Sequence, residues 1–495
     1  MSKFILVTAA VLSTACGSSG GGGGGSGGAA GGAAFGGGGN SGSGGGGAAG
    51  SGGSAASGGA AGSAGQGGGG GAGGSAPGSK FKRIGRMAAP GGPVSDTVGG
   101  FGMDAAASCV VFRHNAHTAL VGTDDGLGFS QQVYHLDVAT GVIARVSLDD
   151  NGKPNPGGTK PESHPGWYNG GAAMRVVNSD CSRVAFTSTA TGVKSKGYVR
   201  DLKSKTTTLV SFADGSSNGV VLSFGGIPVF QDFNEGRAGG PPWTAPMELW
   251  TADPTTGTRT WLSWTPQGGG AAVPSGAQKP HLSDSGTWLI AELGSSALCL
   301  GKAKCAVRRE MATGKWDFVA ARADGKPAAG SSAVDIALSG DGMSMIFKSS
   351  DDILNDGEDT QGKSHLYYID FANKGAWALN QKQDGSFASD LVGFDISADG
   401  RYAAFVADDS LIGLSGGSGL FRYDAQLDKL EALNLDASGK PYQGPFALRP
   451  SFLSPRISAD GKRVIVLASE FPGKSHGLSS TPADDKDTGF YLWEE

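Results

Sequence analysis

Residues 357–364 match, at every position, the GxxxxGK[ST] pattern of loops that hold nucleotide phosphates. That chemistry needs a helix directly after the loop, so that the N–H groups at the start of the helix face the phosphates. Here residues 365–369 are typical of a strand, and the carboxylates of Glu358 and Asp359 would repel a phosphate. We therefore interpret the segment as a structural turn.

A second pattern of catalytic type, GxSxG, occurs at residues 413–417 and puts Ser415 in the place of a nucleophile. Such a serine needs a strand–turn–helix setting and, further along the chain, an acid and a histidine. This copy lies in a polar segment between two expected strands, and His476 is the one histidine that follows it. We interpret it as a loop, and we predict no catalytic residue.

Two groups of residues have the ligand types of a metal site but not its spacing. Carboxylate and amide side chains crowd residues 351–359, yet they do not follow the order of an EF-hand calcium loop. His114 and His117 would face one ion only on a helix, whereas their segment is loop-like and offers no third ligand. We expect a solvated acidic loop and two ordinary histidines, and therefore no metal and no cofactor.

The N-terminus has the pattern of an export signal. Residues 4–12 are apolar, and a small-residue segment ending at Cys16 follows, which is typical of a signal peptide and too short for a membrane span. The cysteine resembles that of a bacterial lipobox, which implies cleavage after residues 1–15 and acylation of the Cys16 thiol. The leucine of that motif is displaced by one position here, because Ser13 stands where the motif has Leu and Leu12 precedes it.

Residues 16–79 form a second, very different segment. After Cys16 it is almost wholly Gly, Ala and Ser, without a charged side chain. Such a composition has nothing to bury and cannot offset its chain entropy, so we expect a disordered tether with a reach of roughly 45 Å. A lipid anchor followed by this tether would hold a folded body, residues 80–495, off a membrane surface.

Four cysteines lie in that body, and an even number in an exported protein favours disulfides. Cys299 and Cys305 flank a Gly-containing reversal between expected strands, which suits a local bridge. Cys109 and Cys181 fall near the starts of equivalent strands in neighbouring repeats, which suits a bridge between repeats. Buried thiols are the alternative for both pairs.

The body is built from repeats, of which residues 337–370 are the clearest. The unit opens with the turn Ser339-Gly-Asp-Gly342, continues into an apolar run at 343–347, and ends in a second run at 365–370. An Asp-Gly pair between apolar runs is typical of a hairpin, and runs this short are strands rather than helices. Each unit then has a tight turn and a third strand.

Related units recur along the whole body. Their first apolar strands are marked by one residue each: Phe112, Phe186, Phe230, Ala291, Phe347, Phe405 and Val466. Repeats of roughly 40–60 residues with several strands each are typical of propeller blades. The sequence therefore predicts an all-β fold, a β-propeller of seven blades, with six or eight as the alternative counts.

The last unit lacks a third strand after residues 490–493. Residues 81–87, at the other end of the body, have the pattern of such a strand and no partner nearby in the sequence. We expect this N-terminal strand to complete the last blade, because closing the ring removes exposed strand edges.

The repeats resemble those of the TolB-type, WD40-like propeller family, whose blade motif is a Ser-Pro-Asp-Gly turn before the strand. The resemblance covers roughly residues 80–495, with the proline replaced by Gly340, Ala398 and Ala459 in the three best copies. The motif implies a fold rather than an activity, because its Ser and Asp cap turns.

The net charge of −5 and the absence of a basic run beyond residues 80–83 argue against nucleic acid as a partner. We therefore expect a monomeric, exported lipoprotein in the periplasm or on the outer-membrane surface of a bacterium. Its propeller would serve as a non-catalytic binding or scaffold module for a protein or glycan of the cell envelope. The alternative is a propeller enzyme, a lyase or hydrolase acting on polysaccharide at the central channel.

Overall fold

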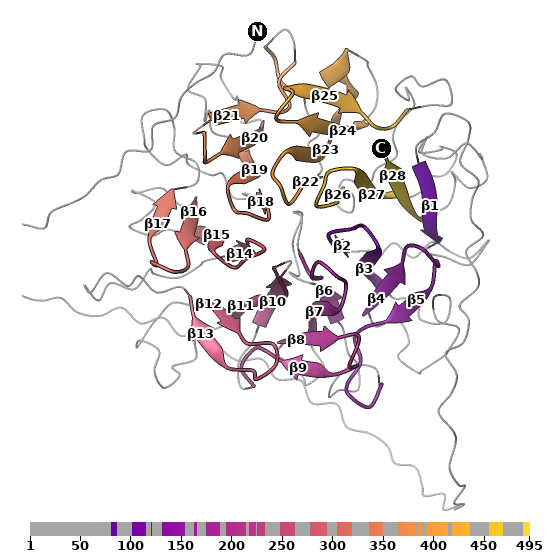
Figure 1. Ribbon diagram of the computed structural model, residues 1–495, viewed down its shortest axis with the longest axis vertical. Coiled ribbons are helices and arrows are strands. Elements are labelled where there is room, and N and C mark those ends of the chain that lie inside the picture. Colours follow the sequence, from indigo (N-terminus) through magenta and orange to yellow (C-terminus); the bar gives the residue numbers. More distant parts are fainter. Residues whose placement is uncertain are drawn as a thin grey trace, which may run out of the picture. The chain divides into compact units, whose positions relative to one another are not determined.

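In the computed structural model the described part of the chain contains seven four-stranded antiparallel sheets, arranged as the blades of a β-propeller (Figure 1). The description covers residues 81–86, 101–114, 120, 131–153, 163–165, 175–188, 195–213, 217–223, 225–232, 248–262, 278–294, 304–318, 336–349, 365–373, 375–382, 385–388, 393–413, 418–435, 455–468 and 489–495. The all-β propeller fold and the count of seven blades are thus confirmed.

The four strands of each blade follow one another from the axis of the propeller to its rim. In this order, blade 1 consists of β2 (Phe101–Met103), β3 (Cys109–His114), β4 (Gln132–Asp137) and β5 (Ile143–Arg145). Blade 2 consists of β6 (Ser163–Pro165), β7 (Arg183–Ser188), β8 (Lys196–Asp201) and β9 (Thr207–Leu209). Blade 3 consists of β10 (Ser217–Leu222), β11 (Pro228–Asp232), β12 (Glu248–Ala252) and β13 (Arg259–Trp261).

Blades 4 to 7 have the same arrangement. Blade 4 consists of β14 (Gln278–Leu282), β15 (Trp288–Gly294), β16 (Lys304–Glu310) and β17 (Trp316–Phe318), and blade 5 of β18 (Ile336–Leu338), β19 (Ser344–Ser349), β20 (His365–Asp370) and β21 (Gly375–Ala378). Blade 6 consists of β22 (Gly393–Ile396), β23 (Tyr402–Asp408), β24 (Ser418–Asp424) and β25 (Lys429–Ala432). Blade 7 consists of β26 (Arg456–Ile457), β27 (Arg463–Ala468), β28 (Gly489–Glu494) and β1 (Phe81–Arg86).

All seven marker residues of the repeats lie in the second strand of their blade, and five of them are phenylalanines. Phe112, Phe186, Phe230, Phe347 and Phe405 are almost completely buried, and burying a side chain of this size stabilises a fold by about 1.5–3 kcal/mol. The sequence interpretation of three strands per unit was incomplete, since a short innermost strand precedes each turn. Several of these strands have only two to four residues, too few for a period to be recognised.

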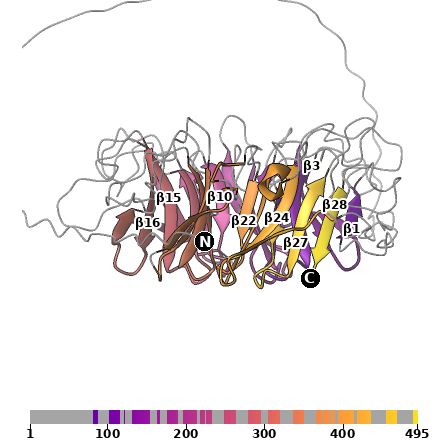
Figure 2. The same cartoon turned by 90° about the horizontal axis from the view of Figure 1, so that it is seen from above.

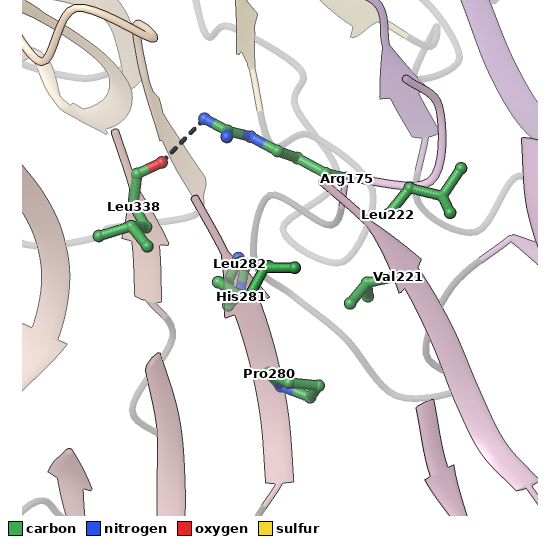
Figure 3. A pocket seen from close by; sticks show the side chains of 7 residues that line it. All are labelled: Arg175, Val221, Leu222, Pro280, His281, Leu282 and Leu338. Carbon is green, nitrogen blue, oxygen red and sulfur yellow. Dashed lines mark hydrogen bonds between the residues drawn. The ribbon is translucent and has the colours of Figure 1, made fainter. Parts of the chain in front are cut away.

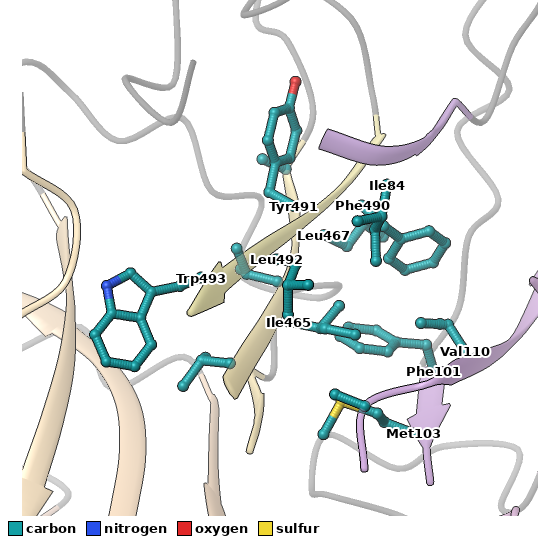
Figure 4. Close-up of a cluster of buried hydrophobic side chains, with 14 of the residues drawn as sticks. Ile84, Phe101, Met103, Val110, Ile465, Leu467, Phe490, Tyr491, Leu492 and Trp493 are labelled. Atoms are coloured by element: carbon teal, nitrogen blue, oxygen red, sulfur yellow. The ribbon is translucent and has the colours of Figure 1, made fainter. Parts of the chain in front are cut away.

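The N-terminal strand closes the last blade, as predicted. β1 is antiparallel to β28, with Phe81 opposite Trp493 and Arg86 opposite Gly489. Ile84 and Phe81 are buried in a core that continues into blade 1 through Phe101 and Phe490, whose ring centroids are 5.2 Å apart (Figure 4). The ring is therefore sealed by residues from both ends of the folded body.

A repeated turn joins the first and second strands of every blade. Its first residue accepts, through its side chain, a backbone N–H at the start of the second strand; in blade 6 this is the Tyr402 N–H to the Ser397 Oγ, at 2.9 Å. Its fourth residue has a positive φ in all seven turns: Ala107, Cys181, Gly226, Gly286, Gly342, Gly400 and Gly461. The Ser and Asp of the motif thus cap turns, as the sequence indicated.

The second residues of successive turns are linked from blade to blade through the main chain. The N–H of Asp284 donates to Gly340, that of Gly340 to Ala398, that of Ala398 to Ala459, and that of Ala459 to Ala105, at 2.7 to 3.1 Å. Proline has no N–H to donate. The residues that replace the proline of the Ser-Pro-Asp-Gly motif are therefore the donors that join blades 4 to 7 to blade 1.

Acid is expected to weaken the fold through the turns that follow the third strands. The Ser204 and Thr256 N–H groups hold the pKa values of Asp201 and Asp253 below the ordinary value. A carboxylate with a lowered folded pKa adds stability above its unfolded pKa of about 3.9, and this stability is lost as the pH falls through the folded pKa. Melting temperatures measured from about pH 6 to about pH 2 should fall. The decline should be shallower in Asp201→Asn, and a flat profile would contradict the prediction.

Candidate functional site on the propeller axis

The two ends of the blades are built differently. At one end, which we call the turn end, short hydrogen-bonded turns join the first strand to the second in every blade and the third to the fourth in blades 1 to 6. At the opposite end, which we call the loop end, lie the strand ends from which the longer connections leave, such as those between His114 and Gln132 and between Ala468 and Gly489. Figure 2 shows the strands running between these two ends.

Arg175 crosses the axis at the turn end. It precedes the bridge between Val177 and Val184, which extends the innermost strand of blade 2. Its Nη1 donates to the Asp284 carboxylate in blade 4, and its Nη2 donates to the Leu338 carbonyl in blade 5, both at 2.8 Å. The Arg175 side chain is only 12 % exposed. One side chain therefore ties blade 2 to two blades that are not its neighbours.

Figure 3 shows the Arg175 guanidinium pointing toward the Leu338 carbonyl, with side chains of β10 and β14 beside it. The recess there is lined by Arg175, Val221, Leu222, Pro280, His281, Leu282 and Leu338, and it is too narrow to admit a water molecule. The arginine and these mostly apolar side chains leave no room for a ligand in this recess.

Two more charged residues of the innermost strands are buried next to the axis. Asp395 of β22 accepts the Ile396 N–H at 2.9 Å and, from blade 7, the Ile457 N–H at 3.1 Å. Arg456 of β26 donates to the Phe101 carbonyl in blade 1 at 2.7 Å and lies over the Phe101 ring. Burial raises the pKa of Asp395, and burial lowers the pKa of Arg456 to about 10.

This cluster is suited to joining blades rather than to reacting with a substrate. As whole residues, Asp395 and Arg456 are 7 % and 4 % exposed, and each side chain bonds to the main chain of the following blade. A general acid or base must reach a substrate proton within hydrogen-bond distance. Since the oxygens of Asp395 already accept backbone N–H groups, this cluster joins blades 6, 7 and 1 to one another.

The structure contains one disulfide within the described residues, between Cys109 of β3 and Cys181 in the first turn of blade 2, with a Cα–Cα distance of 6.4 Å. It links neighbouring blades. Cys305 lies in β16, whereas Cys299 and Cys16 lie outside the described residues. The pairing of Cys299 with Cys305 and the acylation of Cys16 stay predictions.

The other segments singled out in the sequence lie wholly or partly outside the described residues. These are 351–359, 357–364, 414–417 and His117. The strand expected after 357–364 is present as β20, and a short 3-10 helix, η2 (Asp409–Ile412), precedes Gly413. His114 ends β3 and is buried.

Sequence reasoning missed Arg175, Asp284, Asp395 and Arg456. No motif contains Arg175, Asp395 or Arg456, and the partners of Arg175 lie 109 and 163 residues away in the sequence. The position of Asp284 as the second residue of a blade turn was the one available signal, because that position recurs at the same end of every blade. In the part of the chain that the structure describes, no helix is long and apolar enough to cross a bilayer.

Comparison with known proteins gives likeness of fold alone. No family model matches the chain, and no curated protein matches it in sequence. Among solved structures, TolB from Acinetobacter baumannii is 14 % identical over 75 % of this chain and 77 % of its own, with a TM-score of 0.36.

Two further structures are similar to the same degree. An oligogalacturonate lyase from Vibrio parahaemolyticus is 9 % identical over 84 % of this chain and 93 % of its own, with a TM-score of 0.45. The β-propeller domain of the trilobed protease from Pyrococcus furiosus is 10 % identical over 80 % and 92 %, also with a TM-score of 0.45. At such identities and scores, these proteins share a propeller architecture with this chain and supply no argument about its activity.

Proposed function

We propose that the chain is an exported lipoprotein whose propeller is a non-catalytic binding or scaffold module for a protein or glycan of the cell envelope. The observation that carries this proposal is the difference between the two ends of the blades. Arg175 crosses the axis at the turn end, where the connections are short and bonded to one another. A partner therefore meets the propeller at the loop end.

The use of the buried charges supports binding over catalysis. A propeller lyase or hydrolase would need carboxylate, imidazole or guanidinium groups converging on an open channel. Arg175, Asp395 and Arg456 converge near the axis, but each bonds to the main chain of another blade. The alternative of an enzyme acting on polysaccharide has no comparable observation among the described residues.

The start of the folded body agrees with an anchored module. Phe81 is opposite Trp493, which is opposite Val464 just after the last blade turn, so β1 begins at the turn end. The tether expected for residues 16–79 would therefore join the propeller at the turn end. The loop end is then the end of the blades remote from the attachment point.

Charge-reversal variants at the two ends test which end binds. Lys196 and Lys203 belong to the same blade, with Lys196 starting β8 at the loop end and Lys203 in the turn after it. Lys348, near the loop end of β19, and Lys429, at the turn-end start of β25, form a second pair. Envelope proteins and glycans captured by the full chain and identified by mass spectrometry should be lost in Lys196→Glu and Lys348→Glu. They should be kept in Lys203→Glu and Lys429→Glu.

The opposite pattern of loss would place the binding surface at the turn end and overturn the proposal.

A second experiment tests the enzyme alternative. The full chain and its variants are incubated with envelope polysaccharides, and the release of shorter polysaccharide chains is followed. Cleavage that is lost with the loop-end variants would favour the enzyme.

Lipidation of Cys16 is a separate prediction. A cysteine at the end of an apolar signal, followed by an uncharged spacer, should be acylated on its thiol. Cells fed labelled fatty acid should label the wild-type chain and not Cys16→Ser, whereas Cys299→Ser should label like the wild type. Equal labelling of Cys16→Ser would contradict the prediction.

A further inference from the structure

Contacts between neighbouring blades at the turn end repeat the same three positions, and one of these contacts is chemically different. The fourth residue of each turn, with its positive φ, packs against the first part of the second strand of the preceding blade. Gly342 lies against Trp288, Gly400 against Ser344, and Gly461 against Tyr402, so closely that a methyl group on any of these glycines would collide.

The third position lies in the third strand of the preceding blade. It is two residues before the aspartate, or the residue in its place, that caps the turn between the third and fourth strands of that blade. In blades 4, 5 and 6 its side chain donates to the carbonyl of the turn glycine of the next blade. The bonds are Arg308 to Gly342 at 3.1 Å, Tyr368 to Gly400 at 2.6 Å and Arg422 to Gly461 at 2.8 Å.

At the contact between blades 1 and 2, these three positions are Cys109, His135 and Cys181. Cys181 has a φ of 56°, which elsewhere in this repeat is mostly left to glycine, and its side chain is bonded to Cys109. The two sulfur atoms and a ring nitrogen of His135 all lie within 4.8 Å of one another. Cys181 and His135 are partly exposed, so small molecules can reach the group.

We propose that Cys109, Cys181 and His135 form a redox-controlled site for a thiophilic divalent cation such as Zn²⁺. A dithiol reduces the Cys109–Cys181 bond by exchange: the dithiol is oxidised to its own disulfide, and its two protons pass to the two cysteine sulfurs. The cation then binds both sulfurs as thiolates, with release of these protons, and the His135 nitrogen as third ligand. In the reverse exchange a disulfide compound oxidises the pair and is itself reduced to a dithiol, taking up two protons. The Cys109–Cys181 bond that re-forms removes two of the three ligands and expels the ion.

The placement of the ligands supports this over a disulfide alone. Two thiolates and one imidazole are a common protein ligand set for zinc that leaves a fourth position open. The disulfide needs no imidazole beside it. In blades 4, 5 and 6 the polar side chain at this position donates to a turn carbonyl, whereas the His135 ring lies with a nitrogen beside the two sulfur atoms. Cys109 and His135 lie on adjacent paired strands of one blade, and Cys181 lies on the next, so the fold itself brings the ligands together.

Metal binding is tested in the full chain carrying Cys16→Ser, Cys299→Ser and Cys305→Ser, which leaves Cys109 and Cys181 as the only thiols. The protein is reduced, freed of reductant without air, and titrated with Co²⁺ as the probe. The expected result is one Co²⁺ per chain with a thiolate-to-cobalt charge-transfer band, and neither in the oxidised protein. Adding His135→Ala should weaken Co²⁺ binding at least about tenfold, whereas His281→Ala, which removes an imidazole in blade 4, should not.

Three results would overturn the proposal. The first is a reduced, folded protein that takes up no Co²⁺, and the second is binding that is unchanged by His135→Ala or by Cys109→Ser with Cys181→Ser. Thermal melting of each sample shows whether it is folded. If the reduced chain unfolds, Co²⁺ should refold it, and failure to do so is the third such result.

Discussion

Deletion of residues 80–88 should lower the stability of the propeller by an amount comparable to the total stability of an ordinary domain. The deletion removes β1, in which the residues Phe81 and Ile84 are only 4 % and 6 % exposed. Removing one large buried side chain typically costs about 2–5 kcal/mol, and a whole domain is stable by about 5–15 kcal/mol. It also exposes the edge of β28. Thermal and urea unfolding should show a lower midpoint and a broader transition.

The matched controls separate the strand from the segment before it. Deletion of residues 17–79, the expected tether, should leave the midpoint nearly unchanged. Within β1, Ile84→Asp should destabilise strongly, whereas Lys82→Asp, at an exposed position of the same strand, should have little effect. If both deletions melt alike, the pairing of β1 with β28 does not hold the ring together.

Arg456→Met should be the most damaging single substitution among the buried charges. It removes a guanidinium that is bonded to the Phe101 and Pro455 carbonyls and whose positive charge favours the charged form of the buried Asp395 carboxyl. Removing one member of a buried pair of opposite charges typically costs about 3–5 kcal/mol. Urea unfolding at neutral pH should show this loss, and Arg463→Met, at an arginine whose side chain is 43 % exposed, should show much less.

The pH dependence and a double variant identify the cause. Burial raises the pKa of Asp395, so the folded state disfavours its charged form, and this cost grows as the pH rises from the unfolded pKa of about 3.9 through the folded pKa. The difference in the free energy of unfolding between Arg456→Met and the wild type should therefore become smaller as the pH is lowered. Asp395→Asn combined with Arg456→Met should recover part of the loss. A difference that is constant with pH would indicate lost packing instead.

The seven blades could be predicted because each repeat carries local signals that do not depend on its neighbours. The turn at Ser339 joins an Asp-Gly pair to an apolar strand, and its hydrogen bonds are formed within a few residues. The closing strand could be predicted by elimination, because β28 had no third strand after it. The innermost strands were missed because they are short and have no pattern of their own.

The axial residues could not be predicted, because their roles depend on which blades come together. Arg175 follows β6 in the sequence and has no motif, and its partners Asp284 and Leu338 lie two and three blades further on. Nothing local in the sequence distinguishes the buried Arg456 from the partly exposed Arg463. The ligand character of His135 depends on the alignment of three positions in two blades, which becomes visible once the strand register is known.

The position of β1 also has a mechanical consequence. If the chain is held at Cys16 and a partner pulls on the propeller, the force enters the folded body at Phe81, the first residue of β1. Because β1 lies antiparallel to β28 from Phe81 opposite Trp493 to Arg86 opposite Gly489, a pull along the strand toward the turn end shears the backbone hydrogen bonds of this pair together. It does not peel them apart one after another. Under such a load, the β1–β28 pair that completes the ring would also be the contact that resists mechanical unfolding of the propeller.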